Sequence, residues 1–134
     1  MQVCAFLAGL HYSAQHALSE GEGAAAPESV SSLGPSLIVV PATLLSQWLR
    51  ELHLWCPELR VFVLHDSVPH PPGASKRHVV HECFSHPRKA AAGVAPGHGS
   101  VLITTYQSLH ASKSMLLHRE WGYIVLDEGH RIKR

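Results

Sequence analysis

The sequence is short of charge, of cysteine and of long apolar runs, and each shortage excludes something. Only 16% of the 134 residues are charged and the formal net charge is +1, so charge alone argues neither for nor against nucleic acid as a partner. The three cysteines are odd in number and widely spaced, which does not fit a disulfide framework and favours a reducing, intracellular setting. No apolar run approaches the roughly 20 residues that a membrane-spanning helix needs.

The residues that are present suit one globular unit. Hydrophobic residues make up 46% of the chain, so a core is feasible, and the length fits at most one ordinary domain or a piece of one. Twelve histidines are unusual in a chain of this length. They would make the net charge more positive below about pH 6.5.

Short apolar runs alternate with helical patterns along the chain. A strand that is covered on both faces is apolar throughout, and four runs predict such strands: 37–40, 60–64, 101–105 and 123–126. Helices are predicted at 1–18, 43–55, 76–84 and 106–118, and the remainder of 19–36 and 66–99 is polar or rich in Pro and Gly. This alternation predicts an α/β fold with a parallel sheet wrapped by helices.

The fourth predicted strand ends in two adjacent carboxylates, Asp127 and Glu128. Ligands of open parallel sheets bind beyond the carboxyl ends of the strands. Mg²⁺ takes one or two carboxylates together with phosphate oxygens, so the pair suits a magnesium–nucleotide site. One acid would hold the metal while the other orients or activates water. The alternative is a pair of surface acids that cap a following helix.

Two strand-to-helix turns carry residues that suit a phosphate. Pro41-Ala42-Thr43 follows the first strand, where the Thr43 hydroxyl and the first helical N–H groups form a phosphate-binding corner. Thr104, Thr105 and Tyr106 occupy the corresponding turn after the third strand. Simple helix capping is the alternative at both turns, and one residue can serve both roles.

Trp48 and Trp55 lie seven residues apart in the helix predicted at 43–55. This spacing places both indoles on one helix face, together with leucines. We therefore predict that they pack in the core rather than stack on bases.

A cluster of histidine and cysteine supports a rival hypothesis. These side chains ligate Zn²⁺, but their spacing here differs from that of common structural sites. The four candidate ligands are His78, His81, Cys83 and His86.

Three blocks together resemble a known family. Residues 37–48 (LIVVPATLLSQW) are similar to motif Ia, residues 101–106 (VLITTY) to motif Ib, and residues 127–133 (DEGHRIK) to motif II, the Walker B box in its DEGH form. Residues 2–10 are similar to the helix that follows the family's P-loop. In order and spacing the chain resembles the first RecA-like lobe of Swi/Snf-type helicase-like ATPases, and within these it looks most similar to the Cockayne syndrome group B type of DNA-repair translocase.

The resemblance implies a three-layer RecA-like fold, ATP and Mg²⁺ as cofactors, and a nuclear protein. It implies that Asp127 coordinates Mg²⁺, that Glu128 polarises the attacking water, and that His130 couples the nucleotide site to the DNA-binding or interlobe surface, with a structural histidine as the alternative. It further implies double-stranded DNA as the partner, and nucleosomes or the transcription machinery as further partners. The residues that would contact the DNA backbone are Pro41, Ala42, Thr43, Thr104, Thr105 and Tyr106.

The sequence also departs from the family pattern. The Gly-rich P-loop would end just before Met1, the second lobe is absent, residues 66–99 form a longer variable insert or loop, and Arg134 replaces the usual asparagine. We therefore expect 1–134 to be a partial N-terminal helicase ATP-binding lobe, which starts just after the P-loop and ends just after the DEGH box. Such a piece would expose sheet edges and have low stability.

Three functions are compatible with this pattern. The first is a fragment of an ATP-dependent double-stranded DNA translocase, of the chromatin-remodelling and transcription-coupled repair type, which cannot turn over ATP alone. The second is a non-catalytic, truncated form of the same lobe that binds DNA or proteins. The third is a zinc-binding protein.

Overall fold

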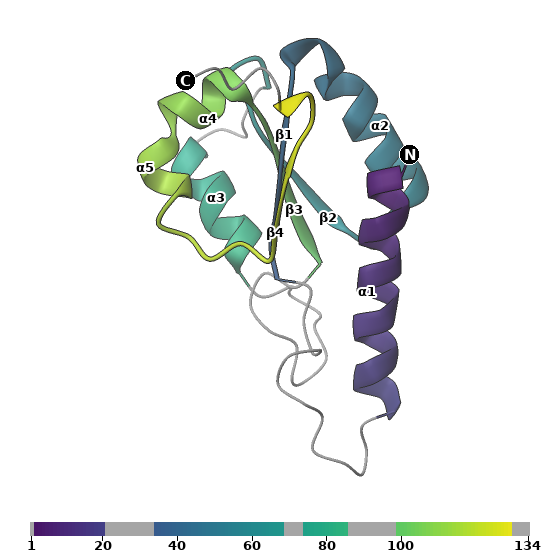
Figure 1. The fold of residues 1–134 in the computed structure, drawn as a ribbon. Helices are drawn as coiled ribbons and strands as arrows, with labels where there is room; N and C mark the ends of the chain where they lie inside the picture. Colours follow the sequence, from purple (N-terminus) through teal and green to yellow (C-terminus); the bar gives the residue numbers. More distant parts are fainter. Residues whose placement is uncertain (1, 21–33, 69–73, 86–98, 130–134) are drawn as a thin grey trace.

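A four-stranded parallel sheet forms the centre of the molecule (Figure 1). The computed structural model describes residues 2–20, 34–68, 74–85 and 99–129. The sheet order is β2-β3-β1-β4, and every neighbouring pair is parallel. The strands are β1 (Ser36–Val40), β2 (Arg60–Leu64), β3 (Ser100–Thr105) and β4 (Tyr123–Leu126).

Helices cover both faces of this sheet (Figure 1). One face carries α1 (Gln2–Glu20) and α2 (Leu45–Trp55), the latter entered through a 3₁₀ turn at Ala42–Leu44. The other face carries α3 (Lys76–Phe84), α4 (Tyr106–Ala111) and α5 (Lys113–Leu116). The predicted α/β class with a parallel sheet is confirmed. No helix among the described residues combines the length and the apolarity that crossing a bilayer requires.

The apolar runs form strands because both of their faces are buried. In β1, Ile38 and Val40 pack toward α1 and α2, whereas Leu37 and Val39 pack toward the helices of the other face. Every residue of β1 and of β3 is buried. Side chains in a strand alternate between faces, so an unbroken apolar run supplies two separate cores.

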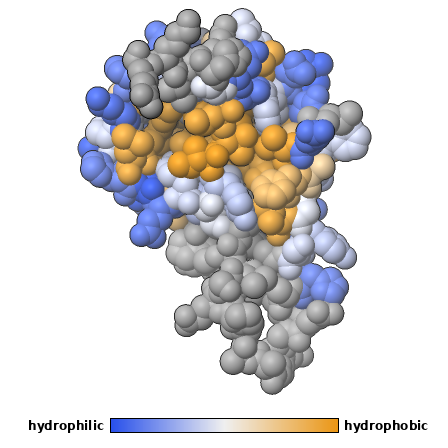
Figure 2. All heavy atoms as spheres, viewed as in Figure 1, coloured by the Kyte–Doolittle hydropathy of each residue, from blue (hydrophilic) through white to orange (hydrophobic). Residues whose placement is uncertain are grey.

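At β4 one edge of the described sheet is exposed. Ile124 is 56% exposed and Leu126 is 43% exposed, although both belong to the apolar run that forms β4. The ring of Tyr123 meets that of Phe6 edge-on at 5.6 Å. Figure 2 shows apolar side chains gathered on this face of the molecule. An exposed apolar edge is the feature from which we predict low stability.

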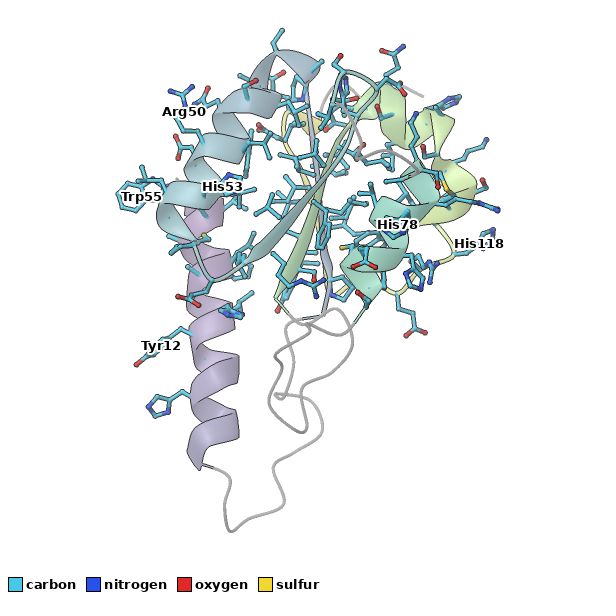
Figure 3. The ribbon with its side chains drawn as sticks, turned by 180° about the vertical axis from the view of Figure 1, so that it is seen from behind. Tyr12, Arg50, His53, Trp55, His78 and His118 are labelled. Atoms are coloured by element: carbon cyan, nitrogen blue, oxygen red, sulfur yellow. The ribbon has the colours of Figure 1, made fainter. Side chains whose placement is uncertain are left out.

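Two local predictions need correction. The helix predicted at 106–118 is instead α4 followed by α5, because the buried Ser112 ends α4 and its N–H is shared between the carbonyl oxygens of Ser108 and Leu109. Trp55 is 52% exposed rather than packed in the core. It is the last residue of α2, and in Figure 3 its side chain points away from the sheet.

Candidate functional site

Asp127 follows β4 directly and is held by three hydrogen bonds from three different elements. Its N–H donates to the carbonyl oxygen of Val39 in β1 at 2.9 Å. Its carboxylate oxygen Oδ2 accepts from the indole Nε1 of Trp48 in α2 at 2.8 Å. Its own carbonyl oxygen accepts from the Tyr106 hydroxyl at the start of α4 at 2.6 Å. The side chain and the main chain of Asp127 therefore have defined positions.

A pocket of about 250 Å³ opens beside this carboxylate. Its lining brings together the first turn of α1, through Cys4, one side of α2, and the end of β4. Asp127 and Glu51 both contribute carboxylates. The amino end of a long helix favours anions, and carboxylate oxygens are the donors that Mg²⁺ prefers, so the donor set suits a metal bound to phosphate. The remaining lining residues are Leu44, Gln47 and Trp48.

Glu128 adopts an uncommon backbone conformation. Its φ of 52° lies in the left-handed region, and no other non-glycine residue in the described part of the chain has a positive φ. Its side chain is exposed. This conformation costs a residue with a Cβ about 1 kcal/mol or more, and such strain is concentrated at functional sites. His130, the third predicted residue of this block, lies outside the described residues.

The first predicted phosphate corner is built without a side-chain cap. The Leu44 N–H donates to the carbonyl oxygen of Pro41 at 2.9 Å, which closes the 3₁₀ turn. Pro41 is buried, whereas Ala42 and Thr43 are exposed. The capping alternative does not hold for Thr43, since α2 starts two residues later with no side-chain cap. The Thr43 hydroxyl thus faces solvent at the carboxyl end of β1.

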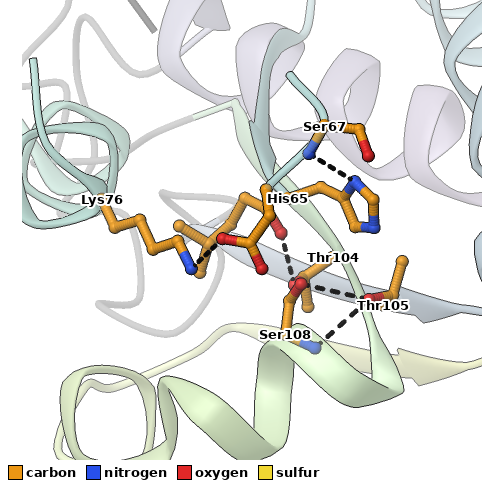
Figure 4. A network of polar contacts seen from close by, with 8 residues as sticks. His65, Ser67, Lys76, Thr104, Thr105 and Ser108 are labelled. Atoms are coloured by element: carbon orange, nitrogen blue, oxygen red, sulfur yellow. Dashed lines mark hydrogen bonds and ion pairs between the residues drawn. The ribbon is translucent and has the colours of Figure 1, made fainter. Parts of the chain in front are cut away.

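In the second turn the threonine hydroxyls have internal partners (Figure 4). The Thr104 hydroxyl is buried and donates to the carbonyl oxygen of Leu64 at 2.8 Å. The Thr105 side chain is 2% exposed and accepts from the Ser108 N–H at 3.2 Å, which caps α4. This geometry favours the capping alternative for Thr105 and a packing role for Thr104. Tyr106 is half-buried against Asp127.

The zinc hypothesis does not fit α3. His81 and His78 are exposed on this helix, whereas Cys83 is buried in the core on its other side. Burial raises the pKa of the Cys83 thiol to about 12, so the thiolate that binds metal is disfavoured. Within the described residues no three His, Cys, Asp or Glu side chains are arranged to hold a metal ion, and His86 lies outside them.

Trp48 lies in this candidate site, although sequence reasoning did not place it there. We predicted a core position from its leucine neighbours, and the indole does pack against the core beneath α2. Its N–H, however, reaches a carboxylate 79 positions away in the chain. A buried tryptophan N–H usually has a hydrogen-bond partner, so a polar contact of Trp48 was predictable from its sequence position. The identity of the partner, Asp127, was not.

Comparison with known proteins identifies the family. The model of the SNF2-related domain matches residues 1–134. The chain belongs to the SNF2-related domain family. Human DNA excision repair protein ERCC-6 is 33% identical over 134 aligned residues, which cover 99% of this chain and 8% of that protein. The rice DNA excision repair protein CSB is 39% identical over 117 residues, which cover 74% of this chain and 10% of that protein.

A relative from chromatin remodelling matches over a shorter stretch. The ISWI chromatin-remodeling complex ATPase ISW2 of budding yeast is 35% identical over 100 residues, which cover 75% of this chain and 8% of that protein. The SNF2-related chain thus spans about a tenth or less of the length of these three relatives. Family membership and the parallel sheet together confirm the predicted α/β RecA-like lobe of a Swi/Snf-type ATPase.

Proposed function

We propose that these 134 residues supply the metal-binding and water-activating half of an ATP site in a DNA-dependent translocase. The observation that carries the proposal is the position of Asp127 at the carboxyl end of β4, in one pocket with the first turn of α1. A helix amino end favours phosphate, and an adjacent carboxylate favours the Mg²⁺ that accompanies it. The 134 residues contain no GxxxxGK(S/T) sequence, so the phosphate-binding loop would come from a segment outside them.

Within this site Asp127 would bind Mg²⁺, directly or through water, and Glu128 would polarise the attacking water. The bound Mg²⁺ would neutralise charge on the phosphates during hydrolysis. The main-chain strain at Glu128 supports a functional role for this residue. His130 would couple the site to the DNA-binding or interlobe surface.

Double-stranded DNA is the proposed partner, bound through its phosphates at two turns. At the first turn Ala42 and Thr43 are exposed, and Thr43 offers a hydroxyl to a phosphate oxygen. At the second turn Tyr106 and the main chain of Thr104 and Thr105 would contribute, since both threonine hydroxyls bond internally. Contacts of this kind carry no sequence information, so binding would be non-specific and salt-sensitive.

Several relatives are named for excision repair or chromatin remodelling. We extend that to this chain as a proposal: a nuclear protein that acts on DNA in repair or remodelling, with nucleosomes or the transcription machinery as further partners. The alternative, a non-catalytic module that binds DNA or proteins, predicts DNA binding without hydrolysis.

The test uses the complete gene product that contains these 134 residues. Its ATP hydrolysis should rise on addition of duplex DNA. Glu128→Gln should reduce turnover by about 100-fold or more while ATP binding persists, because the water-activating carboxylate is lost. Glu120→Gln, a change at an exposed acid before β4, serves as the matched control. Unchanged turnover in Glu128→Gln would reject the role of Glu128, and DNA binding without any hydrolysis in the wild type would favour the non-catalytic module.

A further inference from the structure

We propose that Trp48 and Tyr106 are positioning residues that link the two DNA-facing turns to the metal-binding Asp127, and that DNA stimulates ATP hydrolysis through these two side chains. The proposal rests on the proposed function, because it assigns a regulatory route to the same site. The supporting observation is a pair of hydrogen bonds that meet at Asp127. Each of the two helices that follow the proposed phosphate contacts donates one hydrogen bond to the same residue.

The first link runs through α2. Thr43 lies in the 3₁₀ turn that continues without interruption into α2, and Trp48 is on the first full turn of that helix. The indole N–H of Trp48 ends on Oδ2 of Asp127. Since a helix moves as a unit, a shift of the turn at Thr43 displaces the indole and with it the carboxylate. A hydrogen bond from an N–H to a charged carboxylate is stronger than one between neutral groups. The bond should therefore persist when α2 shifts, so that the Asp127 carboxylate moves with the indole.

The second link runs through α4 and acts on the main chain. Tyr106 is the first residue of α4 and directly follows Thr105. Its hydroxyl bonds the carbonyl oxygen of Asp127 at 2.6 Å. That carbonyl belongs to the peptide group that leads into Glu128, whose φ is 52°. Tyr106 thus fixes the orientation of a peptide next to a strained residue, and so the direction in which the proposed water-activating carboxylate leaves the chain.

The two links are independent and complementary. Trp48 acts on the side chain that would hold the metal, whereas Tyr106 acts on the backbone that orients Glu128. Groups that hydrogen-bond a metal ligand commonly change metal affinity or activity by about 10- to 100-fold when they are removed. Loss of Trp48 should therefore appear mainly in the Mg²⁺ requirement, and loss of Tyr106 mainly in turnover.

The experiment compares Trp48→Phe and Tyr106→Phe in the complete gene product that contains these residues. Both changes keep an aromatic ring and remove the donor. Tyr106→Phe removes only the hydroxyl, whereas Trp48→Phe also removes part of the ring that packs against the core. Trp55→Phe and Tyr12→Phe are matched controls, because both wild-type side chains are exposed and neither lines the pocket. We expect Trp48→Phe to raise the Mg²⁺ concentration for half-maximal hydrolysis by about tenfold. We expect both variants to lose about fivefold or more of the stimulation by duplex DNA, measured at saturating DNA so that a change in DNA affinity does not enter the comparison.

Two outcomes separate this inference from the proposed function. If the wild type shows no hydrolysis that DNA stimulates, the proposed function fails and the inference falls with it. If the wild type is stimulated and both test variants behave as Trp55→Phe and Tyr12→Phe do, only the inference fails. A purely structural role predicts a lower melting temperature with normal Mg²⁺ dependence and normal stimulation, which also overturns the inference.

A measurement without turnover covers the case in which a variant folds poorly. The indole N–H resonance of Trp48 in ¹H–¹⁵N spectra reports its bond to Asp127 and should shift in Asp127→Asn. It should also shift when a short DNA duplex is added to the wild type, while the indole resonance of the exposed Trp55 stays in place. An unmoved Trp48 resonance in saturating DNA would exclude the coupling through α2.

Discussion

The imidazole of His11 in α1 lies directly against the backbone of Gly99, the residue that precedes β3. A Cβ on Gly99 would lie 2.9 Å from Cε1 of the His11 ring, a shorter distance than Cβ atoms keep from other heavy atoms in proteins. Gly99 has a φ of 64°, and its carbonyl oxygen accepts from the Arg60 N–H at 2.8 Å. One glycine thus lets α1, β2 and β3 meet at the amino end of the sheet, opposite the pocket at Asp127.

Replacing Gly99 by alanine should lower the free energy of unfolding. The left-handed conformation alone costs a Cβ-bearing residue about 1–2 kcal/mol, and the contact with the His11 ring adds to it. Gly9→Ala is the control, since nothing lies within 4 Å of a Cβ at Gly9 and alanine favours the helix by about 0.5–1 kcal/mol. Urea denaturation of both variants measures the difference. Equal stability of Gly99→Ala and wild type would show that the turn opens easily.

His11 should make the fold less stable in acid. Burial lowers the pKa of its imidazole below the ordinary value of 6.5, and the nearby Glu58 opposes this shift. Between the folded and unfolded pKa values the unfolded chain binds a proton that the folded chain does not. Stability is therefore fully present above about pH 6.5 and falls as the pH drops, by at most about 1.4 kcal/mol per pH unit from this group.

The measurement is the free energy of unfolding of wild type and His11→Leu between about pH 7.5 and pH 5. The variant should show a shallower decline with acid. Leu117→Ala, a change at an exposed side chain that carries no titratable group, should keep the slope of the wild type. Parallel slopes for wild type and His11→Leu would mean that His11 titrates in the folded state as it does in the unfolded chain.

Cys83 should resist alkylation until the protein unfolds. Its thiol is fully buried, and burial raises its pKa from 9.0 to about 12, so the reactive thiolate is about a thousandfold scarcer at neutral pH. Iodoacetamide followed by peptide mass analysis should modify Cys83 only in denaturant. Rapid labelling of native protein, or stoichiometric zinc that is lost in Cys83→Ala, would restore the metal hypothesis for α3.

Much of the fold was predictable because local pattern and burial agree. The apolar runs of β1 and β3 are buried on both faces, so each reads as a strand without knowledge of its neighbours. Asp127 was predictable as a candidate site residue because ligands of parallel sheets bind beyond the carboxyl ends of the strands. Parallel pairing then places the carboxyl ends of β1, β3 and β4 at the same end of the sheet.

The remainder depends on contacts between residues that are distant in sequence. The Trp48 bond to Asp127 joins α2 to β4 through side-chain orientation, which no local pattern contains. The division of 106–118 at Ser112 depends on a buried serine and a shared N–H. Trp55 is exposed because α2 ends at that residue, although its spacing from Trp48 is correct for one helix face.

Alanine substitutions at Thr43 and Thr105 should distinguish a contact with DNA from a helix-capping role. Both follow strands in motif-like turns, yet the Thr43 hydroxyl faces solvent, whereas that of Thr105 is buried and caps α4. Thr43→Ala should leave the free energy of unfolding unchanged and weaken binding of duplex DNA by about 1 kcal/mol, the worth of one hydrogen bond. Thr105→Ala should cost about 1 kcal/mol of stability through loss of the cap and leave DNA affinity intact.

Serine at each position provides the matched control, because it keeps the hydroxyl. Thr105→Ser should restore most of the stability lost in Thr105→Ala, and Thr43→Ser should restore DNA affinity. Fluorescence anisotropy with a labelled duplex at fixed salt measures binding, since phosphate contacts depend strongly on ionic strength. A loss of DNA affinity in Thr105→Ala at full stability would assign that hydroxyl to DNA, which requires the buried cap to open when DNA binds. Unaltered binding in Thr43→Ala would remove the first turn from the DNA-binding surface, and with it the route through α2 to Asp127.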